Sequence, residues 1–309
     1  MKTGIEIASN FTHLYKNLDY MKDHDNFDLF KKITKKSSPL FVKGGDIISR
    51  NPFVAGYHEI GIEELIRTYR DNGYNDFLID IGANIGLTTC FSGKGFSNIF
   101  CFEPNPQVFR ILQTNVEITF GLDSKVVLNN FGLGDSDAEL ELTIPKNNYG
   151  GAYIKQGNTY SNDILLQKDN ITDPSNAYNY IGVSIKNAEE QLGNLFAGIP
   201  IGSKGVIKID VEGYEPYVLE AIGKILPETN SYAIIFENHN LCTTIFEFQK
   251  FFNRDIVLYR LQHYPIRKFK LLRIIKSYLG ATGKHTLEKV DNNNNNCTGQ
   301  LLLVLDSTK

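Results

Sequence analysis

The sequence predicts an α/β fold: a mostly parallel, seven-stranded sheet with helices on both faces. Short apolar runs alternate with segments of helical periodicity along most of the chain, and strands that alternate with helices usually pair in parallel. Residues 77–103 combine an apolar run, a glycine turn, a helical segment and a second apolar run, which is the build of a nucleoside-binding βαβ unit. Several apolar runs end in an acid, at the edge where open α/β sheets bind ligands.

The first half of the chain is expected to alternate helices and strands. Ile62, Leu65 and Ile66 recur at helical spacing and predict an amphipathic helix. Asn105 is a predicted N-cap, with Pro106 in the first turn of the helix that follows. The expected elements are a helix over residues 60–69, a strand over 77–81, a helix from about residue 86, a strand over 99–102, a helix over 106–120 and a strand over 126–130.

The second half is expected to open with a strand or hairpin over residues 138–144 and a loop over 146–180. Tyrosines punctuate this loop, and their flat apolar faces suit stacking on a sugar ring, although exposed loop tyrosines without a ligand are as common; they are Tyr149, Tyr153, Tyr160, Tyr178 and Tyr180. The later elements are a helix over 186–192, a strand over 205–210, a helix over 215–226, a strand over 232–237, a helix over 244–252 and strands over 256–261 and 300–305. The last two strands are candidates for an antiparallel edge.

Composition places few limits on function. A chain of 309 residues with 42% hydrophobic residues can bury a core, and a net charge of −3 gives no argument for nucleic acid as a partner. The cysteines Cys90, Cys101, Cys242 and Cys297 form no C-x-x-C pair, which favours a reducing cytoplasm. The first residues lack the apolar stretch of a signal peptide, and no run of about 18 apolar residues predicts a membrane span.

The glycine turn after Asp80 favours one class of cofactor. Gly82 and Gly86 allow the backbone to turn sharply and to come close to a ligand, and Glu103 follows at about the 20-residue spacing of an acid that binds ribose hydroxyls. The dinucleotide fingerprint G-x-G-x-x-G fails, because Asn84 and Leu87 occupy its second and third glycine positions. S-adenosylmethionine keeps the ribose and replaces the pyrophosphate with a cationic methionine arm, which Asp80 is placed to attract.

A second group of acids is expected at the same edge of the sheet. Lys208 and Asp210 share one face of their strand, and Asp210 and Glu212 should face the same space as Asp80. The next strand ends in Glu237 and His239. Glu215, just before a proline, is better explained as a charge in the first turn of a helix.

Three segments in this order resemble the FkbM family of S-adenosylmethionine-dependent methyltransferases: DIGANIG at 80–86, FEPNP at 102–106 and KIDVEGYE at 208–215. GYHE at 56–59 is similar to a G-x-x-E element of the family, and NNYGGAY at 147–153 is similar to its Asn/Gly/Ser segment. The resemblance covers roughly residues 51–237. In one departure, Asn187, Ala188, Glu189 and Glu190 stand where the family tends to have Thr-Leu-Asp-Asp, so the usual aspartate has no counterpart here.

The resemblance implies a class I methyltransferase (Rossmann-like) domain over residues 76–309, preceded by a helical lead-in over 1–75. The family commonly methylates hydroxyl groups of sugars or of polyketide-like natural products, and the acceptor expected here is a sugar, either linked to a nucleotide or in a surface glycan. The resemblance assigns the cofactor to Glu59, Asp80, Gly82, Asn84, Gly86, Glu103, Pro104, Asn130, Phe131 and Asp210. Within this set Glu103 binds the ribose, and Asn130 with Phe131 lies near the adenine.

Methyl transfer to an alcohol needs a base, and a nearby one contributes roughly 10²- to 10⁴-fold in rate. The candidates are Asp210, Glu237 and His239, of which His239 is favoured because its pKa is ordinarily nearer neutrality, and Glu212 lines the same crevice. In an alternative mechanism, Asp210, Glu212 and Glu237 hold Mg²⁺ as oxygen ligands. Lys208 would instead pair with one of these acids.

Two other functions remain open: a subunit that binds the cofactor without turnover, and a nucleic-acid methyltransferase. The intact set of acids argues against the first, and the near-neutral charge argues against the second. Residues 256–287 contain no acid and predict either a solvated basic face or a site for a phosphate, a nucleotide-sugar diphosphate or an anionic lipid surface. The basic residues are Arg260, Arg267, Lys268, Lys270, Arg273, Lys276 and Lys284.

Overall fold

The fold is that of a computed structural model, which describes residues 59–122, 125–146, 148–161, 164–165, 177–239, 244–264, 284–290 and 297–307. Most of the helical lead-in expected over 1–75 lies outside these ranges. So do the GYH residues of the GYHE segment and most of the basic segment, including Arg267, Lys268, Lys270, Arg273 and Lys276.

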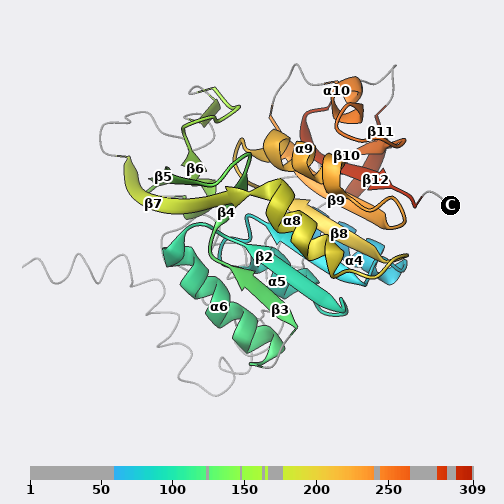
Figure 1. The fold of residues 1–309 in the computed structure, drawn as a ribbon, viewed down its shortest axis with the longest axis horizontal. Coiled ribbons are helices and arrows are strands. Elements are labelled where there is room, and N and C mark those ends of the chain that lie inside the picture. Colours follow the sequence, from blue (N-terminus) through green and yellow to red (C-terminus); the bar gives the residue numbers. More distant parts are fainter. Residues whose placement is uncertain are drawn as a thin grey trace, which may run out of the picture.

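The main sheet of the described residues has eight strands in the order β11-β10-β12-β9-β8-β1-β2-β3 (Figure 1). The neighbouring strands from β3 to β9 pair in parallel, while β12 pairs antiparallel with both β9 and β10, and β11 pairs antiparallel with β10. The strands are β1 (Phe77–Ile81), β2 (Asn98–Phe102), β3 (Val126–Asn129), β8 (Lys204–Ile209), β9 (Ser231–Asn238), β10 (Val257–Tyr264), β11 (Lys284–Lys289) and β12 (Gly299–Leu305). This is the class I methyltransferase arrangement, and it confirms the predicted fold class.

The antiparallel pair expected of the last two strands is confirmed, because β10 and β12 pair antiparallel on the C-terminal side of the sheet. The structure adds β11 as an eighth strand at the outer edge, and it places β12 between β9 and β10. Leu301, Leu302 and Leu303 are fully buried in β12. A continuous apolar run of this kind is typical of a strand covered on both faces, which explains why β12 is inserted into the sheet.

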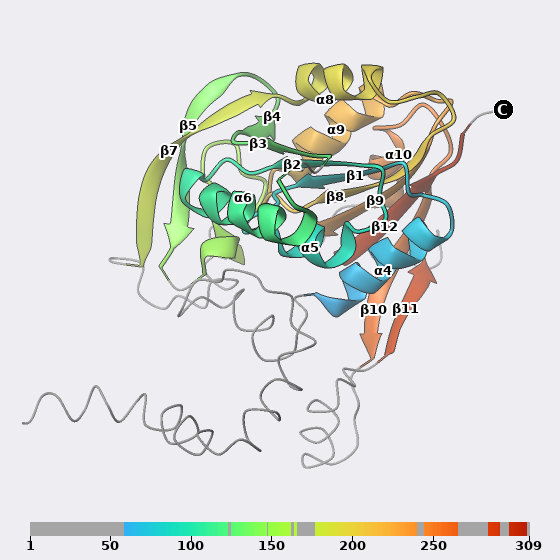
Figure 2. The same ribbon diagram turned by 90° about the horizontal axis from the view of Figure 1, so that it is seen from below.

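Helices cover both faces of the sheet because successive strand residues point to opposite sides. Ile79 and Ile81 pack in the core beneath α8, α9 and α10, whereas Leu78 packs in a second core beneath α4, α5 and α6. Figure 2 shows these two helical layers above and below the sheet. The helices are α4 (Ile60–Asp71), α5 (Leu87–Ser92), α6 (Pro106–Phe120), α8 (Ala188–Ala197), α9 (Glu215–Ile225) and α10 (Ile245–Gln249).

A second, four-stranded sheet stands beside the carboxyl ends of the main strands, in the order β4-β7-β5-β6. Its strands are β4 (Gly132–Gly134), β5 (Ala138–Pro145), β6 (Tyr153–Ile154) and β7 (Tyr178–Asn187), with the short 3-10 helix η1 (Tyr149–Gly151) before β6. The predicted strand over 138–144 is confirmed. The end of the predicted loop and the start of the predicted helix at 186 are wrong, because residues 178–187 form β7, which pairs with β5 and, at its end, with β4, and the helix begins at Ala188.

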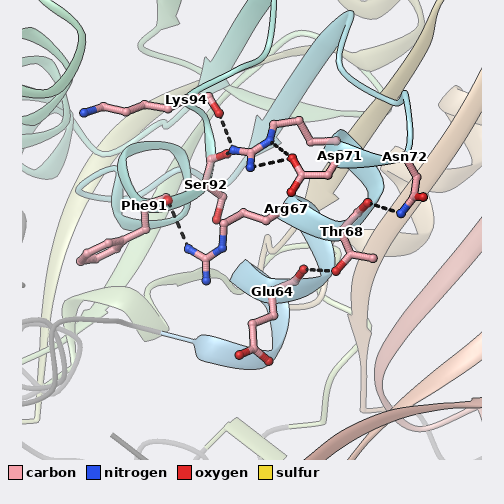
Figure 3. A network of polar contacts seen from close by, with 9 residues as sticks. Glu64, Arg67, Thr68, Asp71, Asn72, Phe91, Ser92 and Lys94 are labelled. Atoms are coloured by element: carbon pink, nitrogen blue, oxygen red, sulfur yellow. Dashed lines mark hydrogen bonds and ion pairs between the residues drawn. The ribbon is translucent and has the colours of Figure 1, made fainter.

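The predicted amphipathic helix α4 is attached to the carboxyl end of α5. Arg67 donates to the carbonyl of Phe91 at 3.4 Å, and Arg70 donates to the carbonyls of Ser92, at 3.5 Å, and Lys94 (Figure 3). Guanidinium groups suit this position, because carbonyl groups at the end of a helix lack partners within the helix and carry a partial negative charge. The carboxyl-terminal half of α4 is thereby held against the end of α5. No described helix is long and apolar enough to cross a membrane.

Candidate active site

A pocket opens at the carboxyl ends of β1, β2 and β8 and is bounded on its other side by the second sheet. Gly82, Glu103 and Asp210 line it just after the three strands, and Ile185 of β7 and Tyr149 of η1 line it from the other side. This is the edge at which open α/β sheets bind ligands. The second sheet therefore forms one wall of the pocket. The sequence predicted this wall only in part, because residues 146–180 were expected to form a loop.

The glycine turn forms the floor of the pocket. Gly82 has φ +82°, and a Cβ built there would lie 1.8 Å from the carbonyl oxygen of Asp210. Asn84 also has a positive φ, of +51°, and its side chain accepts the amide of Ile85 at 2.8 Å. At Gly86, with φ +86°, a Cβ would lie 2.6 Å from Leu112 Cδ1. Glycine is therefore required at 82 and 86 by backbone conformation and by space.

Glu103 is held at the end of β2 by backbone amides. Its Oε2 accepts the amide of Asn84 at 2.9 Å and its Oε1 accepts the amide of Asn105 at 2.7 Å. Burial raises the pKa of Glu103 to about 7, and the two amides oppose that rise because they favour the charged form. Each carboxylate oxygen can accept a further hydrogen bond, so the group suits a diol.

Asp80 is fully buried beneath the turn. Its Oδ2 accepts the hydroxyl of Thr89 at 2.7 Å, whereas its Oδ1 has no hydrogen-bond partner among the described residues. Burial raises the pKa of Asp80, and the nearby Lys208 lowers it. A buried carboxylate oxygen without a partner is costly, and a cationic ligand would satisfy it.

Lys208 and Asp210 form a pair at the third strand end. Lys208 Nζ lies 2.8 Å from Asp210 Oδ2, and both residues line the pocket. Burial alone would lower the pKa of Lys208, but Asp210, Asp80 and Glu59 outweigh it, and the pKa is raised. The ammonium therefore stays charged.

The alternative with Mg²⁺ held by Asp210, Glu212 and Glu237 finds no support. In the ranges that the structure describes, no group of three or more His, Cys, Asp or Glu side chains is arranged to hold a metal ion. The ammonium of Lys208 lies on Asp210 Oδ2 instead, as the pairing alternative expected.

The loop after β8 places Glu212 in the pocket wall in an unusual backbone conformation. Glu212 is buried with φ +53°, and its carbonyl accepts the side-chain amide of Asn158 at 2.8 Å. Glu215 accepts the amides of Val211 at 3.0 Å and Gly213 at 2.8 Å. Glu215 thus holds this loop at the start of α9, which confirms its structural interpretation.

Glu237 and His239 lie beyond the pocket wall rather than in it. Glu237 Oε1 is 3.2 Å from His239 Nε2, and the ring of His239 packs edge-on against Tyr160, with centroids 5.3 Å apart. Tyr160 donates to Glu215 at 3.2 Å. None of these side chains is among the described residues that line the pocket.

Glu59 stands at the N-cap of α4, where the charges of Asp210 and Lys208 act on it. Burial, followed by Asp210, raises the pKa of Glu59 to about 7, and Lys208 opposes the rise. The resemblance assigned this residue to the cofactor. The structure brings it to the Lys208–Asp210 pair.

Asn130 and Phe131 support the pocket from behind. Asn130 Nδ2 donates to the carbonyls of Glu103, at 2.8 Å, and Pro104, at 3.2 Å, while Phe131 packs against Phe102 with ring centroids 5.6 Å apart. Pro104 lines the pocket, and so do the following residues Gly132 and Leu133, whereas neither Asn130 nor Phe131 is in its described lining.

The predicted tyrosines divide between the pocket and other positions. Tyr149 and Tyr153 line it, and Tyr178 packs edge-on against Tyr153 with centroids 6.2 Å apart. Tyr180 is 57% exposed.

Some contributions were missed by sequence reasoning. Thr89, which bonds Asp80, carries no sequence signal of its own, whereas Tyr214, which lines the pocket, lies in the KIDVEGYE segment and was given no role. Of the basic segment, Arg260 is described, and it pairs with Glu288 at 2.7 Å.

Comparisons with known proteins identify the chain as a methyltransferase, and a family model gives the family. The family model "Methyltransferase FkbM domain" matches residues 80–263. "Methyltransferase 1" of Beauveria bassiana (strain ARSEF 2860) is 31% identical over 152 residues, which are 48% of this chain and 59% of that protein. "Hexuronic acid methyltransferase AglP" of Haloferax volcanii is 26% identical over 189 residues, which are 58% of this chain and 63% of that protein. The chain thus spans about three fifths of the length of these curated relatives.

A solved structure described as methyltransferase FkbM from Methylobacillus flagellatus KT is also similar. It has a TM-score of 0.34 and 10% sequence identity, and the match covers 90% of this chain and 59% of that chain.

Proposed function

The chain belongs to the FkbM family of methyltransferases, and on that premise we propose that it transfers a methyl group from S-adenosylmethionine to a hydroxyl oxygen of a sugar. The observation that carries the proposal is the pocket at the glycine turn, which Glu103 lines and beneath which Asp80 is buried. Asp80 suits the cationic amino-acid end of the cofactor, and Glu103 suits its ribose diol.

The residues present fit that cofactor. The partnerless Oδ1 of Asp80 would accept a hydrogen bond from a donor at the methionine end, directly or through water. Glu103 would accept the ribose hydroxyls, because its position is fixed by two backbone amides. Gly82, Asn84 and Gly86 would surround the methionine end. When bound, the cofactor supplies an electrophilic methyl group on a sulfonium.

The chain's own residues would then orient the acceptor and take its proton. In-line transfer requires the acceptor oxygen to be held about 3 to 3.5 Å from the methyl carbon. Asp210 and Glu212 line the pocket and would face the acceptor hydroxyl, with Asp210 as the first candidate for proton acceptor. His239 is the second candidate, because its Nε2 lies 3.2 Å from Glu237 Oε1, a contact that would orient the imidazole ring.

Two observations support a sugar acceptor. The relative from Haloferax volcanii is described as a hexuronic acid methyltransferase. Tyr149 and Tyr153 line the pocket, and aromatic side chains suit stacking on a sugar.

The test is to incubate the purified chain with isotopically labelled S-adenosylmethionine and a panel of nucleotide sugars and glycans, followed by mass spectrometry. Label on a sugar oxygen is the expected result. Label on a nitrogen atom or in nucleic acid would contradict the proposal, and cofactor binding with no transfer to any acceptor would favour a non-catalytic role.

A further inference from the structure

Lys208 occupies the centre of the main sheet at the pocket. It lies in register with Asp80 on β1 and with Ile235 on β9, so its side chain leaves the sheet on the same face as that of Asp80. The side chain is 8% exposed, and its Nζ is 2.8 Å from Asp210 Oδ2. A buried ammonium in this place is surrounded by the groups that would bind the cofactor.

Carboxylates from four segments lie within electrostatic range of Lys208. Asp80 comes from β1, Glu103 from the end of β2, Asp210 from β8 itself and Glu59 from the start of α4, and Lys208 acts electrostatically on each. Glu237 follows Ile235 on the same face of β9 and acts on Glu59. The described surroundings of Lys208 thus hold more carboxylates than ammonium groups.

Buried carboxylates this close together do not all stay ionised unless a cation is near. Without Lys208, some of them would bind protons at neutral pH, and the positive cofactor would have to displace those protons on binding. The ammonium of Lys208 favours the charged form of Asp80, Glu59 and Glu103, and its contact with Asp210 fixes the orientation of that carboxylate.

We propose that Lys208 is a positioning residue of the cofactor site, whose ammonium keeps Asp80 and Asp210 ionised and in place before the cofactor arrives. This inference rests on the proposed function. Lys208 lines the pocket and acts through the carboxylates beside it. Its removal is expected to change the proton balance of binding more than the structure of the pocket.

The test measures binding of S-adenosylhomocysteine by calorimetry between pH 6 and 9, in buffers of different ionisation enthalpy, which gives the number of protons released. For Lys208→Gln we expect about one more proton released at pH 7 than for the wild type. We also expect the pH at which affinity increases to be about one unit higher in this variant than in the wild type. At pH 7 this corresponds to about a tenfold loss of affinity. Lys208→Arg should behave like the wild type, because it keeps the charge.

Lys204→Gln is the matched control, since Lys204 lies on the same strand and is exposed. It should leave proton release unchanged. The double variant Lys208→Gln/Asp210→Asn loses one carboxylate with the ammonium, keeps the local net charge, and should release as many protons as the wild type. If Lys208→Gln does not fold, the proton release of the double variant still tests the inference.

If Lys208→Gln binds with the same proton release and pH dependence as the wild type, the inference about Lys208 is wrong, while the proposed function is unaffected. Extra proton release by the double variant would also overturn the inference. Failure of the wild type to bind S-adenosylhomocysteine would overturn the proposed function together with the inference.

Discussion

Glu103, at the end of β2, accepts the backbone amide of Asn84 at 2.9 Å, so the acid after the second strand is bonded directly to the glycine turn after the first. A carboxylate in this position serves two purposes. It fixes the shape of the turn, and it keeps lone pairs available to a ligand in the pocket. The two strand ends therefore act as one unit.

Glu103→Gln is expected to weaken binding of S-adenosylhomocysteine by about 10- to 100-fold, because hydrogen bonds to a charged group contribute roughly 1.5–3 kcal/mol. The measurement is titration calorimetry at pH 8, where the wild-type carboxylate is ionised. Glu117→Gln is the control, since Glu117 is exposed on α6. Equal affinity of Glu103→Gln and the wild type would exclude a ribose contact.

Gly82→Ala should be far more damaging than Gly73→Ala. Both glycines have positive φ, +82° and +94°, but a Cβ at 82 would lie 1.8 Å from the carbonyl oxygen of Asp210, whereas nothing lies within 4 Å of a Cβ at 73. Strain in the backbone costs roughly 1–2 kcal/mol at either position, and the clash at 82 adds roughly 1–3 kcal/mol. Urea unfolding measures both costs. Similar losses in the two variants would contradict the close approach of β1 and β8.

The stability of the ligand-free protein is expected to fall as the pH rises towards 7. Burial is the main cause that raises the pKa of Glu59, Glu103 and Glu215 from 4.5 to about 7 in the folded chain. Between these values the folded chain holds protons that the unfolded chain has released. Their stabilising contribution is complete below pH 4.5 and is lost as the pH rises through 7.

Thermal unfolding at pH 5.5 and 7.5 checks this expectation, with a melting temperature lower by several degrees at pH 7.5. The double variant Glu59→Gln/Glu103→Gln has fewer such protons to lose and should show a smaller difference. A melting temperature that rises between the two pH values, or an unchanged difference in the double variant, would contradict it.

Local signals in the sequence predicted the βαβ unit well. The side chain of Asn105 accepts the amide of Gln107 at 2.9 Å as the predicted cap, and the turn at Gly82 has the predicted conformation. Each depends on neighbouring residues alone, and such features are readable from a pattern. By contrast, β7 pairs with β5 some 40 residues away, and its polar residues, such as Asn179, gave no strand signal.

The candidate site was predictable at the level of strand ends and not at the level of contacts. The order of acids after the strands placed Asp80, Glu103 and Asp210 at one edge. Whether Lys208 pairs with Asp210, or His239 packs on Tyr160, depends on side chains brought together from distant segments. A sequence pattern does not encode those distances.

Asp210 and His239 offer different positions for the base that takes the acceptor's proton. Asp210 lines the pocket, whereas His239 is beside Tyr160 and outside its described lining. We therefore expect Asp210→Asn to lower kcat by roughly 10²- to 10⁴-fold, the usual contribution of a general base. His239→Gln should lower it by less than about tenfold.

Steady-state kinetics with the acceptor found by mass spectrometry measures both variants, and binding of S-adenosylhomocysteine separates loss of catalysis from loss of the cofactor. The kcat of an enzyme that uses a carboxylate base should stay constant from pH 6 to 8, while that of an enzyme with a histidine base should fall below about pH 6.5. A large loss in His239→Gln, together with such a fall in the wild type, would make His239 the base and reduce Asp210 to orienting the acceptor.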